Sequence, residues 1–112
     1  MAAFLIVDED RNFRDALAIG LRLDGHRALA VGDAEEARAR LRDGGFDCCV
    51  VDAHLADADA LFEIAAASGL RAIATGPHAD LLEAAEARHP RAEALAKPFR
   101  AVDLVSRIAS AA

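Results

Sequence analysis

The sequence predicts one α/β domain, in which a five-stranded parallel sheet carries helices on both faces. Five short apolar runs alternate along the chain with segments whose apolar residues recur at helical spacing. Parallel strands joined by right-handed crossovers form an open, doubly wound sheet, and we expect the strand order 2-1-3-4-5. A chain of 112 residues has the size of a single domain, and the sequence contains neither an internal repeat nor a linker.

The first strand and helix are predicted by a continuous apolar run followed by a helical stripe. Residues 3–7 are all apolar, which is typical of a strand buried on both faces. Residues 12–23 carry apolar side chains at helical spacing, with Asn12 as the expected N-cap and Gly25 as the expected stop.

The second strand and helix have clear boundary signals. Residues 28–31 form the next apolar run. Asp33 precedes a helical segment and Glu36 stands three residues later, which resembles a capping box. We expect this helix to end at Gly44 and Gly45, because glycine is favoured just beyond helix C-termini.

The third strand contains both cysteines of the chain. Residues 48–51 form a buried strand, and a short helix is expected over residues 60–67. Cys48 and Cys49 are neighbours, so on a strand their side chains point to opposite faces. This arrangement excludes a disulfide scaffold and indicates reduced core thiols in a cytoplasmic protein.

The C-terminal part predicts two more strand–helix units. Residues 71–74 form the fourth strand and residues 93–96 a weaker fifth strand. Pro77 is expected in the first turn of the helix between them, which ends before Pro90. The last helix has an apolar stripe that we expect to face the core: Val102, Val105 and Ile108.

Composition and charge exclude several classes of function. The 13 basic and 19 acidic residues give a net charge of −6, which excludes direct nucleic-acid binding through a broadly basic surface. No apolar run approaches the ~18 residues that membrane insertion requires, and the N-terminus lacks the positive region of a signal peptide. Although 29 residues are alanine, the apolar content is too high for a disordered chain.

Polar residues able to do chemistry follow four of the five predicted strands: Asp8, Glu9, Asp10, Asp52, Thr75 and Lys97. Ligands of such sheets bind beyond the carboxyl ends of the strands, where adjacent first and third strands would bring Asp8, Glu9 and Asp52 together. Converging carboxylates repel each other unless a hard cation lies among them, and this donor set suits Mg²⁺. A carboxylate beside Mg²⁺ can attack a phosphoryl group, whose charge a hydroxyl and an ammonium would stabilise.

These motifs, each after a strand and in the same order, resemble the receiver domain of two-component response regulators, the CheY-like family: Asp8-Glu9-Asp10, Cys-Cys-Val-Val-Asp52, Ile-Ala-Thr75-Gly and Ala-Lys97-Pro98-Phe99. The resemblance spans essentially the whole chain. It implies that residues 1–112 form one receiver domain with a flavodoxin-like, CheY-like fold. It also implies a single-domain response regulator in a phosphorelay, with output through protein–protein contact or phosphate relay.

The resemblance implies a role for each site residue. Asp52 would accept a phosphoryl group from a histidine kinase or a histidine phosphotransfer protein, and slow autodephosphorylation would remove it. The expected Mg²⁺ ligands are the carboxylates of Asp8, Glu9 and Asp52 and the backbone carbonyl of His54. Thr75 would contact the phosphoryl group and Lys97 would pair with it, with a cis Lys97–Pro98 bond. No further enzymatic activity is expected.

Some residues depart from the family pattern and motivate a second hypothesis. Glu9 stands where the family most often has Asp, Ala56 and Ala60 replace the usual Pro and Gly, and Ala94 replaces the switch aromatic. Glu9 and Ala94 motivate the alternative of a degenerate receiver that acts as a phosphorylation-independent interaction module. Whether the fourth helix, fifth strand and fifth helix form a dimer face stays open, as does the downstream partner.

A third hypothesis belongs to another class of protein. The Asp8-Glu9-Asp10 run also resembles the Asp-x-Asp signature of haloacid-dehalogenase-like phosphatases, with Thr75 and Lys97 as later motifs. Asn12 replaces the usual Thr or Val of that signature, and no late acidic motif follows Lys97. This hypothesis also leaves Asp52 without a role, so we rank it below the other two.

Overall fold

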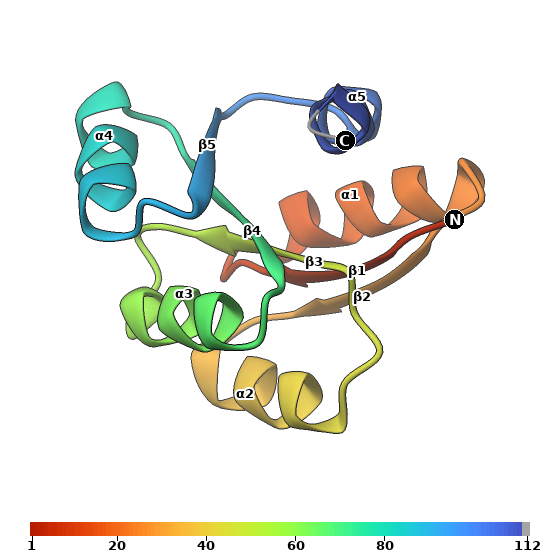
Figure 1. The fold of residues 1–112 in the computed structure, drawn as a ribbon. Coiled ribbons are helices and arrows are strands. Elements are labelled where there is room, and N and C mark those ends of the chain that lie inside the picture. Colours follow the sequence, from red (N-terminus) through yellow and green to blue (C-terminus); the bar gives the residue numbers. More distant parts are fainter. Residues whose placement is uncertain (111–112) are drawn as a thin grey trace.

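The computed structural model describes residues 1–110, with side chains through residue 108, as a five-stranded parallel sheet between two layers of helices (Figure 1). The strands are β1 (Ala3–Val7), β2 (Arg27–Val31), β3 (Cys48–Asp52), β4 (Arg71–Gly76) and β5 (Ala92–Ala96). The helices are α1 (Arg11–Leu23), α2 (Ala34–Asp43), α3 (Ala58–Ala67), α4 (Ala79–Arg88) and α5 (Ala101–Ser110). The strand order is β2-β1-β3-β4-β5, so the predicted fold class and topology are confirmed.

The two faces of the sheet carry separate apolar cores. Figure 1 shows α1 and α5 on one side of the sheet and α2 and α3 on the other. Leu5 and Val7 pack toward α2, α3 and α4, whereas Phe4 and Ile6 pack toward α1 and α5. This alternation follows the two-residue period of a strand and explains why β1 is apolar throughout.

The adjacent cysteines follow the same alternation. Cys49 belongs to the core under α2, α3 and α4, and Cys48 belongs to the core under α1 and α5. Both thiols are free and buried, as predicted. Burial raises the pKa of the Cys48 thiol well above its usual range and that of Cys49 to about 12. Burial and the raised pKa both disfavour the thiolate, so the two cysteines serve as packing groups.

The first helix begins earlier than predicted. Its N-cap is Asp10 and not Asn12, because Asp10 Oδ1 accepts a hydrogen bond from the Phe13 backbone N–H at 3.2 Å. An extended Asp whose carboxylate reaches the first helical turn is among the strongest caps. The prediction for the second helix is correct, since Asp33 Oδ1 accepts from the Glu36 N–H at 2.8 Å.

Two further helices also begin at positions that differ from the prediction. Helix α3 starts at Ala58, immediately after Asp57, which has a left-handed backbone with φ of 65°. Helix α4 starts at Ala79 with His78 as its N-cap, so Pro77 precedes the helix. The reason is that β4 extends to Gly76, which pairs with Ala96 of β5 and leaves Pro77 in the turn.

The predicted apolar stripe of the last helix is confirmed except at Val102. Leu104 is fully buried at its centre, and Val105 and Ile108 pack beside it, as predicted for these two residues. Val102, however, is 53% exposed, because residues 101, 104, 105 and 108 share the face that meets the sheet. Within residues 1–110, no helix is long and apolar enough to cross a membrane.

Candidate functional site

The proposed phosphoacceptor Asp52 is the last residue of a central strand. The residue is only 6% exposed, and its register partner on the neighbouring strand β4 is Thr75. Asp52 Oδ1 accepts a hydrogen bond from the His54 N–H at 3.0 Å, so the loop after β3 holds this oxygen. The second carboxylate oxygen of Asp52 faces the lysine described below.

Asp8 follows the neighbouring strand β1 and is even more deeply buried, at 1% exposure. Its backbone N–H donates to the carbonyl of Val31 at 3.2 Å, which extends the β1–β2 pairing by one residue. Asp8 Oδ1 accepts from the Asp10 N–H at 2.8 Å. The acid is therefore fixed by its own loop, and only Oδ2 remains to meet a partner across the site.

That partner is Lys97, which follows β5. Lys97 Nζ lies 2.7 Å from Asp8 Oδ2 and 3.8 Å from Asp52 Oδ2. The Lys97 N–H donates to the carbonyl of Gly76 at 2.8 Å, which ties the residue to β4. The Lys97–Pro98 bond is cis, as the resemblance implies. One ammonium thus bridges two buried carboxylates that come from two adjacent strands.

The hydroxyl of Thr75 is the unpaired polar group of this site. Thr75 is 1% exposed, and its Oγ1 has no hydrogen-bond partner among the described residues. Buried hydroxyls are nearly always hydrogen-bonded, because desolvation without a partner is unfavourable. A donor with no partner, on the strand beside Asp52, indicates a ligand with an acceptor atom at this end of the sheet.

Glu9 does not join the cluster. Its side chain is exposed, and its backbone carbonyl accepts from Arg14 Nη1 at 3.2 Å, as does that of Asp8 at 3.0 Å. Across the described residues, no three His, Cys, Asp or Glu side chains are arranged to hold a metal ion. The expected convergence of three carboxylates is therefore reduced to two, because Glu9 lies on the loop beyond the strand end.

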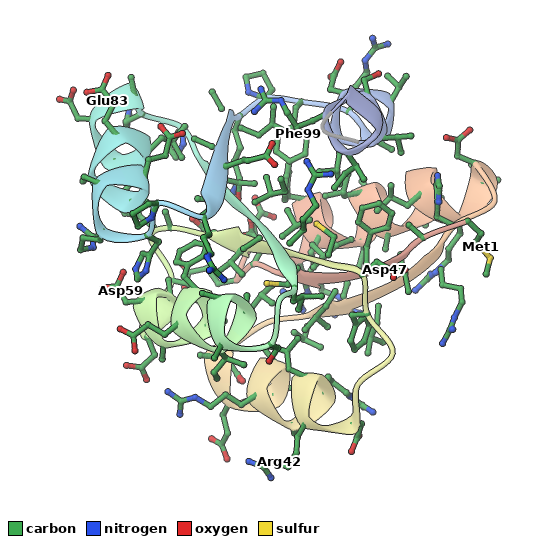
Figure 2. The ribbon with its side chains drawn as sticks, viewed as in Figure 1. Met1, Arg42, Asp47, Asp59, Glu83 and Phe99 are labelled. Carbon is green, nitrogen blue, oxygen red and sulfur yellow. The ribbon has the colours of Figure 1, made fainter. Side chains whose placement is uncertain are left out.

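Two residues near the site were not predicted from the sequence. Phe13 lies with its ring centroid 4.4 Å from Lys97 Nζ, and Arg14 binds the backbone of the acidic loop. Phe13 also packs edge-on against Phe99, which lies on the α1 and α5 side of the sheet (Figure 2). From the sequence, Phe13 is predicted only as part of the helical stripe. Its contacts with Lys97 and Phe99, near the other end of the chain, have no local sequence signal.

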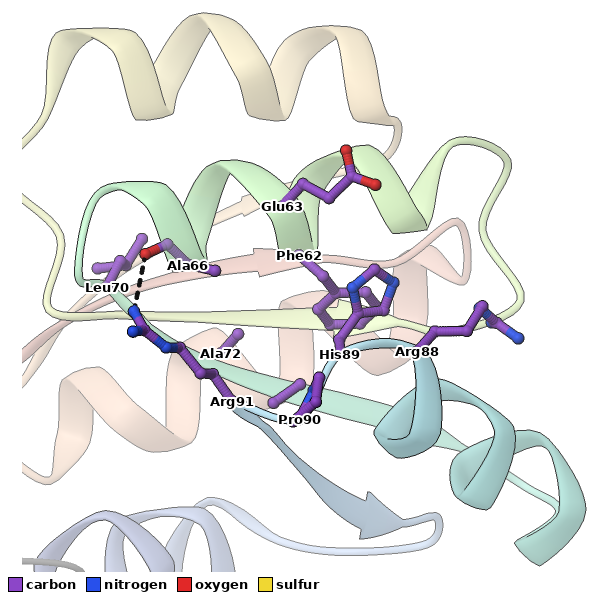
Figure 3. A pocket seen from close by; sticks show the side chains of 10 residues that line it. Phe62, Glu63, Ala66, Leu70, Ala72, Arg88, His89, Pro90 and Arg91 are labelled. Carbon is purple, nitrogen blue, oxygen red and sulfur yellow. Dashed lines mark hydrogen bonds between the residues drawn. The ribbon is translucent and has the colours of Figure 1, made fainter.

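A cavity of about 300 Å³ lies at the opposite end of the strands. It is bounded by α3 and the α4–β5 turn, where Phe62 and His89 face each other with ring centroids 5.0 Å apart (Figure 3). His89 Nε2 lies 2.7 Å from Asp59 Oδ1, and Arg91 donates to the Ala66 carbonyl at 3.2 Å. Its walls are at the beginnings of β4 and β5, so it is separate from the carboxyl-end site.

A doubly wound sheet with two buried acids, a hydroxyl and a lysine at its carboxyl end is the arrangement that the sequence led us to expect of a receiver domain. Comparison with solved structures supports this class. A response regulator receiver domain protein from Clostridium thermocellum is 25% identical with a TM-score of 0.83, and the match covers 99% of this chain and 94% of that chain. Many other structural neighbours are receiver domains that match nearly the full chain, so the predicted resemblance is confirmed.

Two further neighbours show the range of proteins that contain this fold. The chemotaxis response regulator CheY4 of Vibrio cholerae is 20% identical with a TM-score of 0.80, and the match covers 100% of this chain and 99% of that one. NtrX from Brucella abortus is 27% identical with a TM-score of 0.84, and the match covers 98% of this chain but 26% of NtrX. No protein-family model and no curated protein matches the sequence.

Proposed function

We propose that this protein is a phosphoacceptor of two-component signalling and that Asp52 carries the phosphoryl group. The observation that supports this most strongly is the combination of a buried, loop-held Asp52 carboxylate, the Lys97 ammonium 3.8 Å away, and the unpartnered Thr75 hydroxyl on the adjacent strand. A nucleophile, a cation and a hydrogen-bond donor at one sheet edge are what transfer of a phosphoryl group requires.

Asp52, Thr75 and Lys97 each have a distinct part in the proposed reaction. A carboxylate oxygen of Asp52 forms a bond to phosphorus while the bond from phosphorus to a histidine nitrogen of the donor breaks. The Thr75 hydroxyl donates a hydrogen bond to a phosphoryl oxygen. Lys97 exchanges part of its pairing with Asp8 for pairing with the new negative charge, and it needs little movement because it already lies near both acids. Water later hydrolyses the acyl phosphate.

The two buried acids also fit a magnesium ion. Mg²⁺ is usually held by one or two carboxylates together with phosphate oxygens and water, so Asp8 and Asp52 can supply the carboxylate ligands. We propose that the His54 carbonyl completes it and that Glu9 contributes from the loop, through water. The bound ion would neutralise phosphoryl charge, while Asp8, Asp52 and Lys97 determine where that charge lies.

The proposed partners and compartment follow from this role. The donor is a histidine kinase or a histidine phosphotransfer protein, and the output is a contact with a downstream protein. The proposed compartment is the cytoplasm, which the two free thiols Cys48 and Cys49 support, because free cysteines persist where the environment is reducing.

The test is phosphorylation by acetyl phosphate with Mg²⁺, followed by intact mass spectrometry in acid-free conditions. We expect one added phosphoryl group on the native chain and none on Asp52→Asn. Asp57→Asn is the matched control, because Asp57 is an exposed carboxylate of the same loop and should leave labelling unchanged.

Other results would favour the two remaining hypotheses. A chain that stays unmodified would instead be an interaction module, and the exposed side chain of Glu9 motivates that alternative. Repeated turnover of a small phosphate ester that is lost in Asp8→Asn but kept in Asp52→Asn would indicate a phosphatase. The observed cap role of Asp10 at helix α1 weighs against the phosphatase, because it engages the second acid of that signature.

A further inference from the structure

We infer that Phe13 is a positioning residue for Lys97, and this inference rests on the proposed phosphoacceptor function. The Phe13 ring centroid lies 4.4 Å from Lys97 Nζ, well within the ~6 Å over which a cation is attracted to an aromatic face. The Lys97 side chain is only 19% exposed. Such a contact is stronger when it is shielded from water, so the ring forms a second holding point for the ammonium.

The ring itself is firmly held. Phe99 packs against it edge-on, with centroids 5.4 Å apart and an interplanar angle of 77°. Such an aromatic pair favours this T-shaped arrangement. Phe13 also packs on the core under α1 and α5, and its backbone N–H is bound by the cap residue Asp10 at 3.2 Å. The ring therefore presents a fixed face to the site.

These contacts form a closed series that begins and ends at Asp8. Asp8 Oδ1 accepts from the Asp10 N–H, and Asp10 Oδ1 accepts from the Phe13 N–H. The Phe13 ring faces Lys97 Nζ, which donates to Asp8 Oδ2 at 2.7 Å. The loop after β1 and the first turn of α1 thus fix both Asp8 and the Phe13 ring, which contact the same Lys97 ammonium. The position of the ammonium is tied to that of the acid by four successive contacts.

The ring has a property that a third carboxylate would lack. Lysine has a flexible four-carbon stem and a compact ammonium, so an ion pair alone leaves several positions open to it. An aromatic face attracts the ammonium without accepting a conventional hydrogen bond. Phe13 therefore keeps Lys97 between Asp8 and Asp52 while leaving its N–H groups available to a phosphoryl oxygen.

The test compares Phe13→Leu, which removes the aromatic face, with Phe13→Tyr, which keeps it. Lys97 is the only lysine, so a chain labelled with carbon-13 lysine gives a single side-chain ε-methylene signal. Atoms above a ring face are shielded, and we expect that signal upfield in the native chain and in Phe13→Tyr. In Phe13→Leu it should move downfield, and Asp52 phosphorylation by acetyl phosphate should slow by about fivefold.

The matched control is Phe46→Leu, because Phe46 is a half-buried phenylalanine on the opposite core. It should leave both the Lys97 signal and the labelling rate unchanged. An unmoved Lys97 signal in Phe13→Leu, or equal slowing in the Leu and Tyr variants, would overturn the inference. If the native chain is not phosphorylated at all, the proposed function fails, and the NMR signal still decides independently whether the ring holds the lysine.

Discussion

Lys97 Nζ is closer to Asp8 Oδ2, at 2.7 Å, than to Asp52 Oδ2, at 3.8 Å. The lysine therefore pairs first with an acid that is not the proposed acceptor. Both acids are almost completely buried, and each has one oxygen bound to a backbone N–H of its own loop. A cation that enters the site must share the two remaining oxygens with Lys97, and this competition leads to the first prediction.

Lys97→Met should strengthen Mg²⁺ binding and weaken phosphorylation. The change removes the ammonium but keeps an apolar stem, so two buried carboxylates lose their counter-ion and should bind Mg²⁺ about tenfold more tightly. Labelling by acetyl phosphate should fall, because the phosphoryl charge loses its lysine. Calorimetric titration with Mg²⁺ measures the first effect, and Arg100→Met provides an exposed basic control. Unchanged Mg²⁺ affinity in Lys97→Met would show that the lysine does not compete for the acids.

Thr75→Val should make the protein more stable and less active. Thr75 Oγ1 is buried without a partner, so replacing the hydroxyl by a methyl should raise the free energy of unfolding by about 1 kcal/mol. The phosphoryl group loses its donor, and labelling of Asp52 should slow. Urea unfolding measures the stability. Thr75→Ser keeps the hydroxyl and should retain labelling, so a Ser variant as slow as the Val variant would contradict this role of the hydroxyl.

Asp57→Gly should stabilise the fold. Asp57 has φ of 65°, and a side chain in this left-handed region strains the backbone, whereas glycine adopts it freely. We expect a gain of about 1 kcal/mol in the free energy of unfolding, even though glycine also raises the conformational entropy of the unfolded chain. Thermal unfolding provides the measurement, and Asp57→Ala, which keeps the Cβ, should show no gain. Equal stability of the Gly and Ala variants would mean that the loop stores no strain.

Asp59→Asn should lower the thermal stability of the fold at neutral pH but not in acid. The hydrogen bond from His89 and the contact with Arg88 lower the pKa of the Asp59 carboxyl below its usual value near 3.8. A lowered folded-state pKa contributes stability above the unfolded value, and this contribution is lost as the pH falls through the folded pKa. The difference in Tm between native chain and variant should therefore shrink below about pH 4. A constant difference from pH 7 to pH 3 would exclude the linkage.

The sheet and most of the site could be predicted from the sequence because both depend on local patterns. Buried parallel strands are continuous apolar runs, and the residue after each run necessarily lies at the carboxyl edge of the sheet. Asp8, Asp52, Thr75 and Lys97 are therefore expected at one edge, where the structure has them. The direction of a side chain within a loop has no such local pattern, so the exposed position of Glu9 cannot be predicted in this way.

The remaining differences arise from contacts that no local pattern encodes. Asp10 takes the cap in place of Asn12 because its carboxylate reaches the Phe13 N–H while its own N–H binds Asp8. Val102 is exposed because the face of α5 that packs on the core is formed by its neighbours Ala101, Leu104 and Val105. The contact of Phe13 with Lys97 joins the first helix to the end of the fifth strand, two segments that lie far apart in the sequence.

The strand order gives the charged groups of the site unequal support. Asp8 and Asp52 follow or end the central strands β1 and β3, which have a neighbour on each side, whereas Lys97 follows β5, which pairs with β4 alone at the edge of the sheet. Elements with fewer buried contacts open locally at lower free energy than core strands. We therefore expect local opening of β5 to move the cation while the acids stay in place.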